Sequence, residues 1–219
     1  MVTSVNVSGL RKSYNAGYGA VPVLVNLSFQ LAAGESLALT GPSGSGKSTL
    51  LNILCGLESL DGGGIHVLGT PGESLSADEW AGLRRRRLGV VFQDSNLMPA
   101  MTLEENVKLR ADLAGRSFGP VRDWLARLGL AGLEQRYPDQ VSGGQRQRAA
   151  LAMVFAMGPE LVLADEPTGS LDRHTARDVA DALFHLQRTQ GCGLILATHD
   201  LALAGRCDRR LDLADGGQG

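Results

Sequence analysis

The strongest constraint on the fold is an eight-residue segment, residues 41–48, with the sequence GPSGSGKS. It matches the pattern G-x-x-x-x-G-K-[ST] and lies between a short apolar stretch, residues 36–40, and a helix that Gly56 can close. Glycines let successive backbone N–H groups converge on an anion, and the helix N-terminus adds its dipole. The pattern predicts a phosphate-binding loop in which Lys47 reaches the β- and γ-phosphates and the Ser48 hydroxyl binds Mg²⁺. An ordinary glycine-rich turn is the alternative, which the flanking strand and helix disfavour.

Strand and helix patterns alternate along the remaining sequence. From about residue 94 to 157 the pattern is helical, with a capping box from Thr102 to Glu105. A further helix before the last expected strand places Val179 and Leu183 on one side. The expected strands lie at residues 5–7, 21–31, 36–40, 60–69, 88–92, 161–165 and 194–198. This alternation predicts an α/β fold with a mostly parallel sheet and a helical insertion.

Three polar residues follow two of these apolar strands. Asp165 and Glu166 end the strand at residues 161–165, and His199 follows the strand at residues 194–198. Asp165 is placed to hold Mg²⁺ through water, which leaves Glu166 to orient and deprotonate an attacking water. Open α/β sheets bind ligands at the carboxyl ends of their strands, so we expect His199 near the γ-phosphate. The alternatives are a strand-end turn capped by acids and a structural or exposed histidine.

A second glycine-rich helix start lies at residues 141–145, with the sequence VSGGQ. Ser142 can cap the helix, two glycines allow close approach, and the helix dipole again points outward. A single nucleotide needs only one phosphate cradle, so this second motif is expected to serve a nucleotide held by another subunit. A simple N-cap loop is the alternative.

The VSGGQ segment resembles the signature motif of ABC ATPases, which is usually LSGGQ, and the resemblance covers essentially the whole chain. It implies that Tyr14 is the aromatic residue that stacks on adenine and that Gln93 contacts Mg²⁺ and the coupling region. Residues 170–172, with the sequence SLD, match the D-loop, and His199 matches the switch histidine. The implied structure is the ABC ATPase fold, a P-loop parallel-sheet core with an antiparallel β subdomain and a helical insertion.

The resemblance also implies an organisation, a set of ligands and a set of site residues. Residues 1–219 would form one nucleotide-binding domain, with a catalytic core at about 1–92 and 158–219 and a helical subdomain at about 93–157. The cofactors would be ATP and Mg²⁺, the metal contacts Ser48, Gln93 and Asp165, and the catalytic residues Glu166, His199 and Gln93. The nucleotide contacts would be Tyr14, Gly41, Ser43, Gly44, Ser45, Gly46, Lys47, Ser48, Thr49, Ser142, Gly144 and Gln145.

Longer segments are similar to one branch of this family. DEPTGSLD, VVFQDSNLMP and MTLEENV resemble the small ATPases of lipoprotein-release, macrolide- or peptide-efflux, haem-efflux and cell-division complexes. The resemblance implies an ATP-hydrolysing subunit that pairs head to tail with a second copy. It would power a membrane permease on a separate chain, at the cytoplasmic face of the membrane. A mechanical ATPase that moves no substrate is the alternative. A scaffold without turnover is disfavoured by the intact Lys47, Glu166 and His199.

Composition limits the classes of partner that this chain can bind. The formal net charge of the 219 residues is −2, which argues against a nucleic-acid partner, because neutralising phosphates needs a basic excess. No apolar run approaches the ~20 residues that a membrane-spanning helix needs. The three cysteines, Cys55, Cys192 and Cys207, are far apart in the sequence and are expected to be reduced packing residues.

Some segments depart from the family pattern or have two interpretations. Val141 replaces the usual leucine of the signature motif, and Met153 stands where the family typically has arginine. The run of four arginines at residues 84–87 is expected to be a solvated face or turn, with a contact to lipid headgroups or to a permease as the second interpretation.

Leu97, Met98 and Met101 follow Gln93 in a segment that we expect to be flexible. Because methionine-rich surfaces adapt to partners, we expect them to help form the groove for a coupling helix of the permease. Internal packing of the helical subdomain is the alternative.

Overall fold

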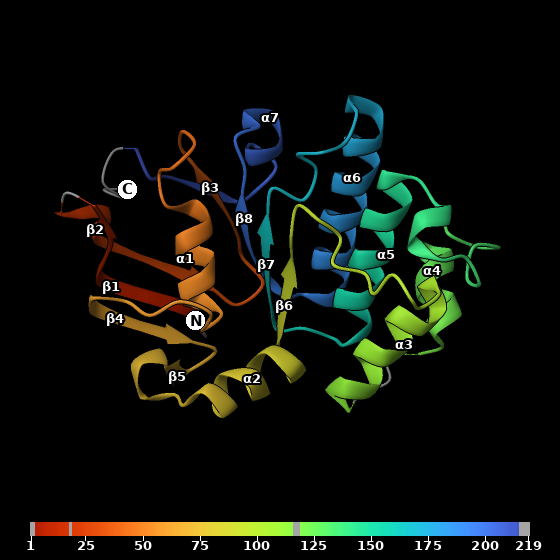
Figure 1. Ribbon diagram of the computed structural model, residues 1–219, viewed down its shortest axis with the longest axis horizontal. Helices are drawn as coiled ribbons and strands as arrows, with labels where there is room; N and C mark the ends of the chain where they lie inside the picture. The colour runs from red at the N-terminus through yellow and green to blue at the C-terminus, as the bar shows by residue number, and fades with distance from the viewer. Residues whose placement is uncertain (1–2, 18, 116–118, 215–219) are drawn as a thin grey trace.

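A computed structural model of the chain describes residues 3–17, 19–115 and 119–214. The centre of the fold is a five-stranded sheet in which every paired strand is parallel (Figure 1). Its strand order is β6, β7, β8, β3, β9, with a crossover between sequence neighbours as an α/β fold requires. The strands are β6 (Leu88–Val91), β7 (Leu161–Asp165), β8 (Gly193–Ala197), β3 (Ser36–Thr40) and β9 (Arg209–Asp212).

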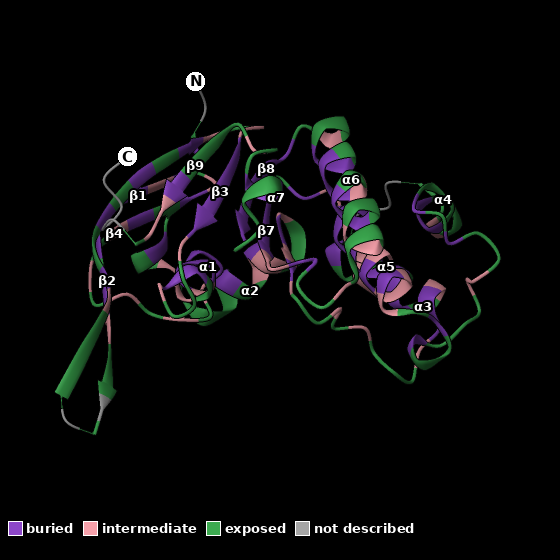
Figure 2. Ribbon diagram, turned by 90° about the horizontal axis from the view of Figure 1, so that it is seen from above, coloured by how far each residue is buried: buried purple, intermediate pink, exposed green. Residues whose placement is uncertain are grey.

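A second sheet is antiparallel and has the order β2, β1, β4, β5. Its strands are β1 (Thr3–Ala16), β2 (Gly19–Ala32), β4 (Gly62–Val67) and β5 (Thr70–Pro71). One buried cluster joins side chains of this sheet, of helix α1 (Lys47–Leu54) and of the parallel sheet. The outer part of the β1–β2 hairpin extends beyond this core and is exposed (Figure 2).

The helical insertion lies at the end of the molecule away from the antiparallel sheet (Figures 1 and 2). It contains α3 (Leu103–Ala114), α4 (Val121–Arg127), the 3-10 turn η2 (Pro138–Gln140) and α5 (Gly143–Ala156). These helices share a buried cluster with α6 (Arg173–Gln190) and with strands β6, β7 and β8. Because that cluster crosses the boundaries expected at about residues 92 and 158, the division into core and subdomain stays a prediction.

Two helix starts were predicted from their capping residues, and both predictions are confirmed. Thr102 accepts from the Glu105 backbone N–H, and the Glu105 carboxylate accepts from the Thr102 backbone N–H. Ser142 and Gln145 make the same reciprocal pair at the start of α5. Within the described residues, no helix is both long and apolar enough to cross a bilayer.

Elements that lack a strong sequence pattern complete the fold. They are η1 (Gly72–Ser74), α2 (Ala77–Arg86) and α7 (Leu201–Ala204). No periodic sequence pattern predicts α2, although Ser76 and Glu79 form a capping box at its start. All three cysteines are described and all are free thiols. Cys55 and Cys192 are buried and Cys207 is half-buried, as expected for packing residues. Burial raises the pKa of Cys55 to about 11.

The arginine run is only partly the solvated surface that the sequence suggested. Arg85 and Arg86 are exposed, as predicted. Arg84 instead donates to the carbonyl oxygens of Cys55 and Gly56 at 2.8 and 3.2 Å, closing the end of α1. Arg87 forms a bidentate pair with Glu160 at 2.7 Å, and hydrogen bonds to charged groups are stronger than neutral ones. Half of the run therefore joins distant parts of the fold, a role that the sequence does not reveal.

Candidate nucleotide site

The glycine-rich loop lies between β3 and α1, as the sequence predicts. Gly46 caps α1 with φ at 94°, in the left-handed region that favours glycine. A Cβ on Gly46 would lie 2.7 Å from Leu24 Cδ2 and 2.9 Å from Val23 Cγ1, so strand β2 leaves no room for a side chain. Glycine at position 46 therefore lets the loop pack closely against β2, and α1 begins directly after it with the N-terminal end that favours an anion.

Polar groups in and beside this loop have hydrogen-bond donors or acceptors that remain unused. Lys47 is buried, and its ammonium donates to the carbonyl oxygens of Gly41 and Pro42 at 2.8 and 3.0 Å. The buried hydroxyl oxygens of Thr40 and Ser45 have no hydrogen-bond partner among the described residues. Unpaired buried hydroxyls are costly, so they fit a site completed by polar ligand atoms. Ser43 and Ser48 are exposed and Thr49 is half-buried.

Glu166 and His199 meet at the carboxyl ends of β7 and β8. The distance from Glu166 Oε2 to His199 Nδ1 is 3.0 Å, and the Thr198 hydroxyl lies 3.4 Å from the same oxygen. Glu166 adopts a φ of 44°, an uncommon conformation for a residue with a side chain. Strained backbone of this kind concentrates at functional sites. Since β3 and β8 are neighbours, Lys47, Glu166 and His199 share one edge of the sheet, as predicted.

Asp165 is the last residue of β7, and Gln93 lies just after β6. The two strands are paired. Asp165 is half-buried and Gln93 is exposed. A Cβ on Gly169 would lie 3.4 Å from Gln93 Nε2, so this amide lies beside the turn that follows Glu166. The buried Gln147 of α5 donates to the Phe92 carbonyl at 2.9 Å and fixes the backbone next to Gln93.

Tyr14 lies on β1 and is 41% exposed. The Lys12 ammonium lies 5.2 Å from the centre of its ring. Tyr14 belongs to the antiparallel sheet, which shares its buried cluster with α1. It is therefore on the side of the molecule that carries the glycine-rich loop, in keeping with a contact to the base of the same nucleotide.

The second glycine motif is far from the first. Ser142 is exposed at the N-terminus of α5, and Gly144 is buried against α6, where a Cβ would overlap the Cγ2 methyl of Thr175. Helices α1 and α5 stand apart along the length of the molecule in both views (Figures 1 and 2). The two glycine-rich helix starts therefore lie apart within one chain. Residues 170–172 lie in the turn before α6, with Asp172 capping that helix.

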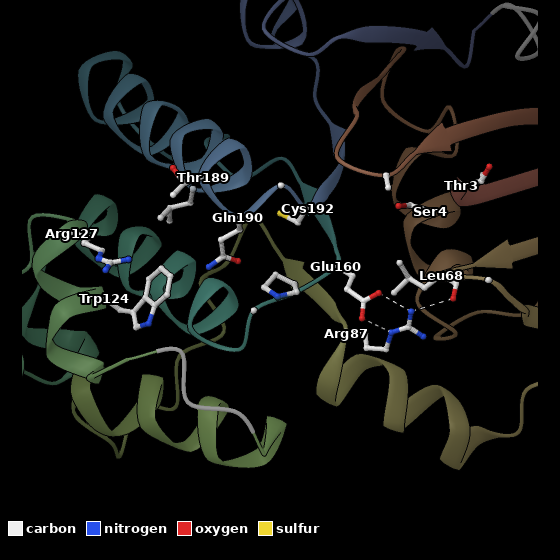
Figure 3. Close-up of a pocket in the computed structure, with 16 residues that line it drawn as sticks. Thr3, Ser4, Leu68, Arg87, Trp124, Arg127, Glu160, Thr189, Gln190 and Cys192 are labelled. Carbon is white, nitrogen blue, oxygen red and sulfur yellow. Dashed lines mark hydrogen bonds and ion pairs between the residues drawn. The ribbon is translucent and has the colours of Figure 1, made fainter. Parts of the chain in front are cut away.

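Two cavities lie at opposite ends of the strands of the parallel sheet. One of about 660 Å³ adjoins Glu166 and His199 and extends along α6. Another of about 660 Å³ lies at the opposite, amino-terminal ends of β1, β7 and β8 (Figure 3). There Trp124 and Gln190 face the Arg87–Glu160 pair across the opening (Figure 3). This second cavity contains none of the predicted site residues and is not the nucleotide site.

Sequence reasoning missed two residues that hold this site together. Thr198 accepts from the Asp200 backbone N–H at 3.1 Å and contacts Glu166, so it fixes the turn that carries His199. Gln147 supports the segment of Gln93 from α5. For Thr198, the available sequence signal was a threonine directly before a histidine at the end of a strand. Gln147 gave none, because its partner is 55 residues away.

The fold and site share three features: a parallel sheet, a glycine-rich loop before α1, and carboxylates that follow β7 at the same end of the sheet. These features define the P-loop nucleoside triphosphatases. The sequence model of the ABC transporter family matches residues 24–169. The chain therefore belongs to the ABC transporter family, as an ATP-binding subunit that hydrolyses ATP.

Individual relatives agree with this assignment. The chain is 44% identical over 216 residues to YbbA, an uncharacterized ABC transporter ATP-binding protein of Escherichia coli strain K12, with 97% of this chain and 95% of that protein covered. It is 44% identical to LolD, the lipoprotein-releasing system ATP-binding protein of Anaeromyxobacter dehalogenans, with 97% and 91% covered.

Among solved structures, the chain is similar to a dimeric post-hydrolysis state of the ATP-binding cassette MJ0796 bound to ADP and Pi. The TM-score is 0.87 at 34% identity, with 97% of this chain and 95% of that chain covered.

Proposed function

We propose that two copies of this chain close head to tail over two Mg-ATP and thereby drive a membrane permease on a separate chain. The observation that carries this proposal is the separation of the loop at α1 from the glycine-rich N-terminus of α5 within one chain. A second copy in the opposite direction would place its Ser142, Gly144 and Gln145 against the nucleotide held by Lys47. The dimeric structures of the similar cassette MJ0796 support this arrangement.

Within each composite site, the residues divide the work. Lys47 and the α1 backbone hold the phosphates, and Tyr14 stacks on the adenine. Mg²⁺, held by Ser48, Asp165 and Gln93, would neutralise charge on the β- and γ-phosphates. Glu166 would orient and deprotonate the attacking water, and His199, which contacts Glu166, would lie near the γ-phosphate.

The coupling surface lies beside Gln93. A cavity of about 280 Å³ there is lined by the segment after β6, by Arg84 and Arg110, and by Met153 of α5. Met98 is 52% exposed and Leu97 packs against the helical cluster, but neither these two residues nor Met101 lines this cavity, so their part in a permease groove stays a prediction. We propose this cavity as the contact for a permease segment at the cytoplasmic face of the membrane, with Met153 giving it an apolar wall where the family has arginine.

Two processes are candidates for what ATP hydrolysis drives. Similarity to LolD favours export of a cargo through a permease. The candidate cargoes are a lipoprotein, a peptide, a macrolide and haem. The alternative is a mechanical ATPase that moves no substrate, as in cell-division complexes. Transport into vesicles that contain this chain and its permease separates the two, because only the first moves cargo when ATP is added.

The head-to-tail dimer is tested with Glu166→Gln. Glutamine keeps the size of the side chain but cannot accept the proton from water, so ATP should stay intact and hold the dimer closed. Light scattering with Mg-ATP should show a dimer. Adding Ser142→Arg should return the protein to a monomer, because a bulky cation blocks the motif that faces the partner's nucleotide.

The matched control is Ser74→Arg in the Glu166→Gln background, since Ser74 is exposed in η1 beside the antiparallel sheet. This control should still dimerise. A Ser142→Arg double variant that dimerises equally well contradicts the composite site and leaves a lone P-loop.

A further inference from the structure

The surroundings of Tyr14 contain a charge cluster that the nucleotide site, as proposed so far, does not use. Lys12 lies two residues before Tyr14 on β1, and its side chain is only 7% exposed. Its ammonium is 2.7 Å from Glu58 Oε1 and 3.6 Å from Asp61 Oδ1. A lysine so buried needs such partners, because an unpaired ammonium is costly away from water.

The cluster joins β1 to the turn that follows α1. The other Asp61 oxygen accepts from the Ser13 backbone N–H at 2.7 Å, and the Asp61 N–H donates to the Arg11 carbonyl at 2.9 Å. The turn is thus bonded to the strand on both sides of Lys12. The hydrogen bond to Glu58 raises the pKa of Lys12, so the ammonium stays charged at neutral pH.

The same ammonium fixes the tyrosine ring. It lies 5.2 Å from the ring centre, within the range in which a cation is attracted to an aromatic face. The pairing of β1 with β2 shifts register between Lys12 and Ser13, an irregularity that re-aims side chains at functional sites. The cation lies over the ring, and Tyr14 is nevertheless 41% exposed, so part of its side chain stays open to a ligand.

We infer that Lys12, anchored by Glu58 and Asp61, is a positioning residue that holds the Tyr14 ring at a fixed place relative to helix α1. The phosphate loop lies at the N-terminus of α1, and Glu58 lies in the turn that follows its C-terminus. The cluster therefore sets where the base end of a nucleotide lies relative to its phosphate end. This inference rests on the proposed contact between Tyr14 and adenine.

The test uses Lys12→Met, which keeps the buried stem but removes the cation. Glu58 and Asp61 are 31% and 44% exposed, so water can solvate them and the fold should survive, which thermal unfolding checks. A lost cation–π contact predicts a rise of about 2- to 5-fold in the KM for ATP, with kcat unchanged. Lys12→Arg should restore the KM, and the exposed Lys108→Gln on α3 should leave both constants unchanged.

A double variant shows whether Lys12 acts through the ring. In the Tyr14→Ala background, Lys12→Met should raise the KM no further. Binding of inorganic tripolyphosphate, which has no base, should be the same in every variant. A further rise in that background, or weaker tripolyphosphate binding, would overturn the inference.

The failures of the two proposals are distinguishable. If Tyr14→Ala raises the KM and Lys12→Met does not, positioning by Lys12 is wrong and the adenine contact stands. If Tyr14→Ala leaves the KM unchanged, the adenine contact itself is wrong, and the inference is overturned with it.

Discussion

Lys47 folds over its own loop, and its ammonium has two neutral acceptors among the described residues, the carbonyls of Gly41 and Pro42. An ammonium has three N–H donors, so one remains for a phosphate oxygen. A charge-assisted bond is about twice as strong as one to a neutral carbonyl. Lys47 therefore braces the loop and still has one N–H that can bind an anion.

Lys47→Ala should weaken ATP binding and abolish hydrolysis. Hydrogen bonds to charged groups contribute about 1.5–3 kcal/mol, which corresponds to a loss of affinity of about 10- to 150-fold. Calorimetric titration with Mg-ATP measures the first effect, and phosphate release in the presence of the permease measures the second. Turnover at the wild-type rate would refute the assignment of the loop.

At the residue scale, the sequence predicts those roles that follow from a motif and misses those that follow from a fold. The positions of Lys47, Asp165 and Glu166 could be predicted because glycine spacing and strand ends place them locally. The left-handed backbone of Glu166 could not, because its N–H donates to the carbonyl of Ala197 in β8, which is distant in the sequence. Lys12 gave no signal either, since its partners lie more than 40 residues away.

At the scale of elements, the contact of α5 with α6 determines how the signature motif is presented. Gly144 lies directly against Thr175, whose hydroxyl donates to Asp172 Oδ2 at 2.6 Å in the first turn of α6. The start of α5 and the cap of α6 are therefore one packed unit. The sequence predicts both helices and the Ser142 cap, but it cannot show that the second glycine is needed to let them touch.

Gly144→Ala should push α5 away from α6. The added Cβ overlaps the Thr175 methyl, and overpacking of this kind costs about 1–3 kcal/mol. Thr175→Ser removes the methyl and keeps the hydroxyl, so Gly144→Ala/Thr175→Ser should recover most of the stability and ATP-driven dimerisation. Chemical denaturation and light scattering are the measurements.

The control for that change is Gly82→Ala in α2, where a Cβ would have no neighbour within 4 Å. It should leave stability unchanged or raise it by up to about 1 kcal/mol, because alanine favours a helix more than glycine does. A double variant as unstable as Gly144→Ala alone would mean that the methyl of Thr175 is not the obstacle.

At the scale of the whole molecule, the proposed dimer gives each chain half of two sites. A symmetric pair would place the phosphate loop of either copy against the Ser142 motif of the other, so one dimer would hold two equivalent sites. In that arrangement no single chain supplies both halves of one site, since α1 and α5 stand apart (Figures 1 and 2). Two chains with different defects can therefore complement each other.

Mixing Lys47→Ala with Ser142→Arg tests this directly. Each variant alone should be inactive, because both of its sites are damaged. In a mixed dimer, one site combines the intact loop of the Ser142→Arg chain with the intact motif of the Lys47→Ala chain. Random pairing makes half of the dimers mixed, with one good site in each, so an equimolar mixture should show about a quarter of the wild-type activity if the sites act independently.

The control mixture combines Lys47→Ala with Glu166→Gln, two defects on the same half of the site. Every dimer in that mixture lacks a complete site, so its ATPase activity should stay at the level of the separate variants. Recovery in both mixtures would mean that the halves are not divided as proposed. An inactive first mixture, in which native mass spectrometry nevertheless detects mixed dimers, would contradict independent head-to-tail sites. Recovery in the first mixture alone requires that a nucleotide bound at Lys47 of one chain is completed by Ser142 of the other.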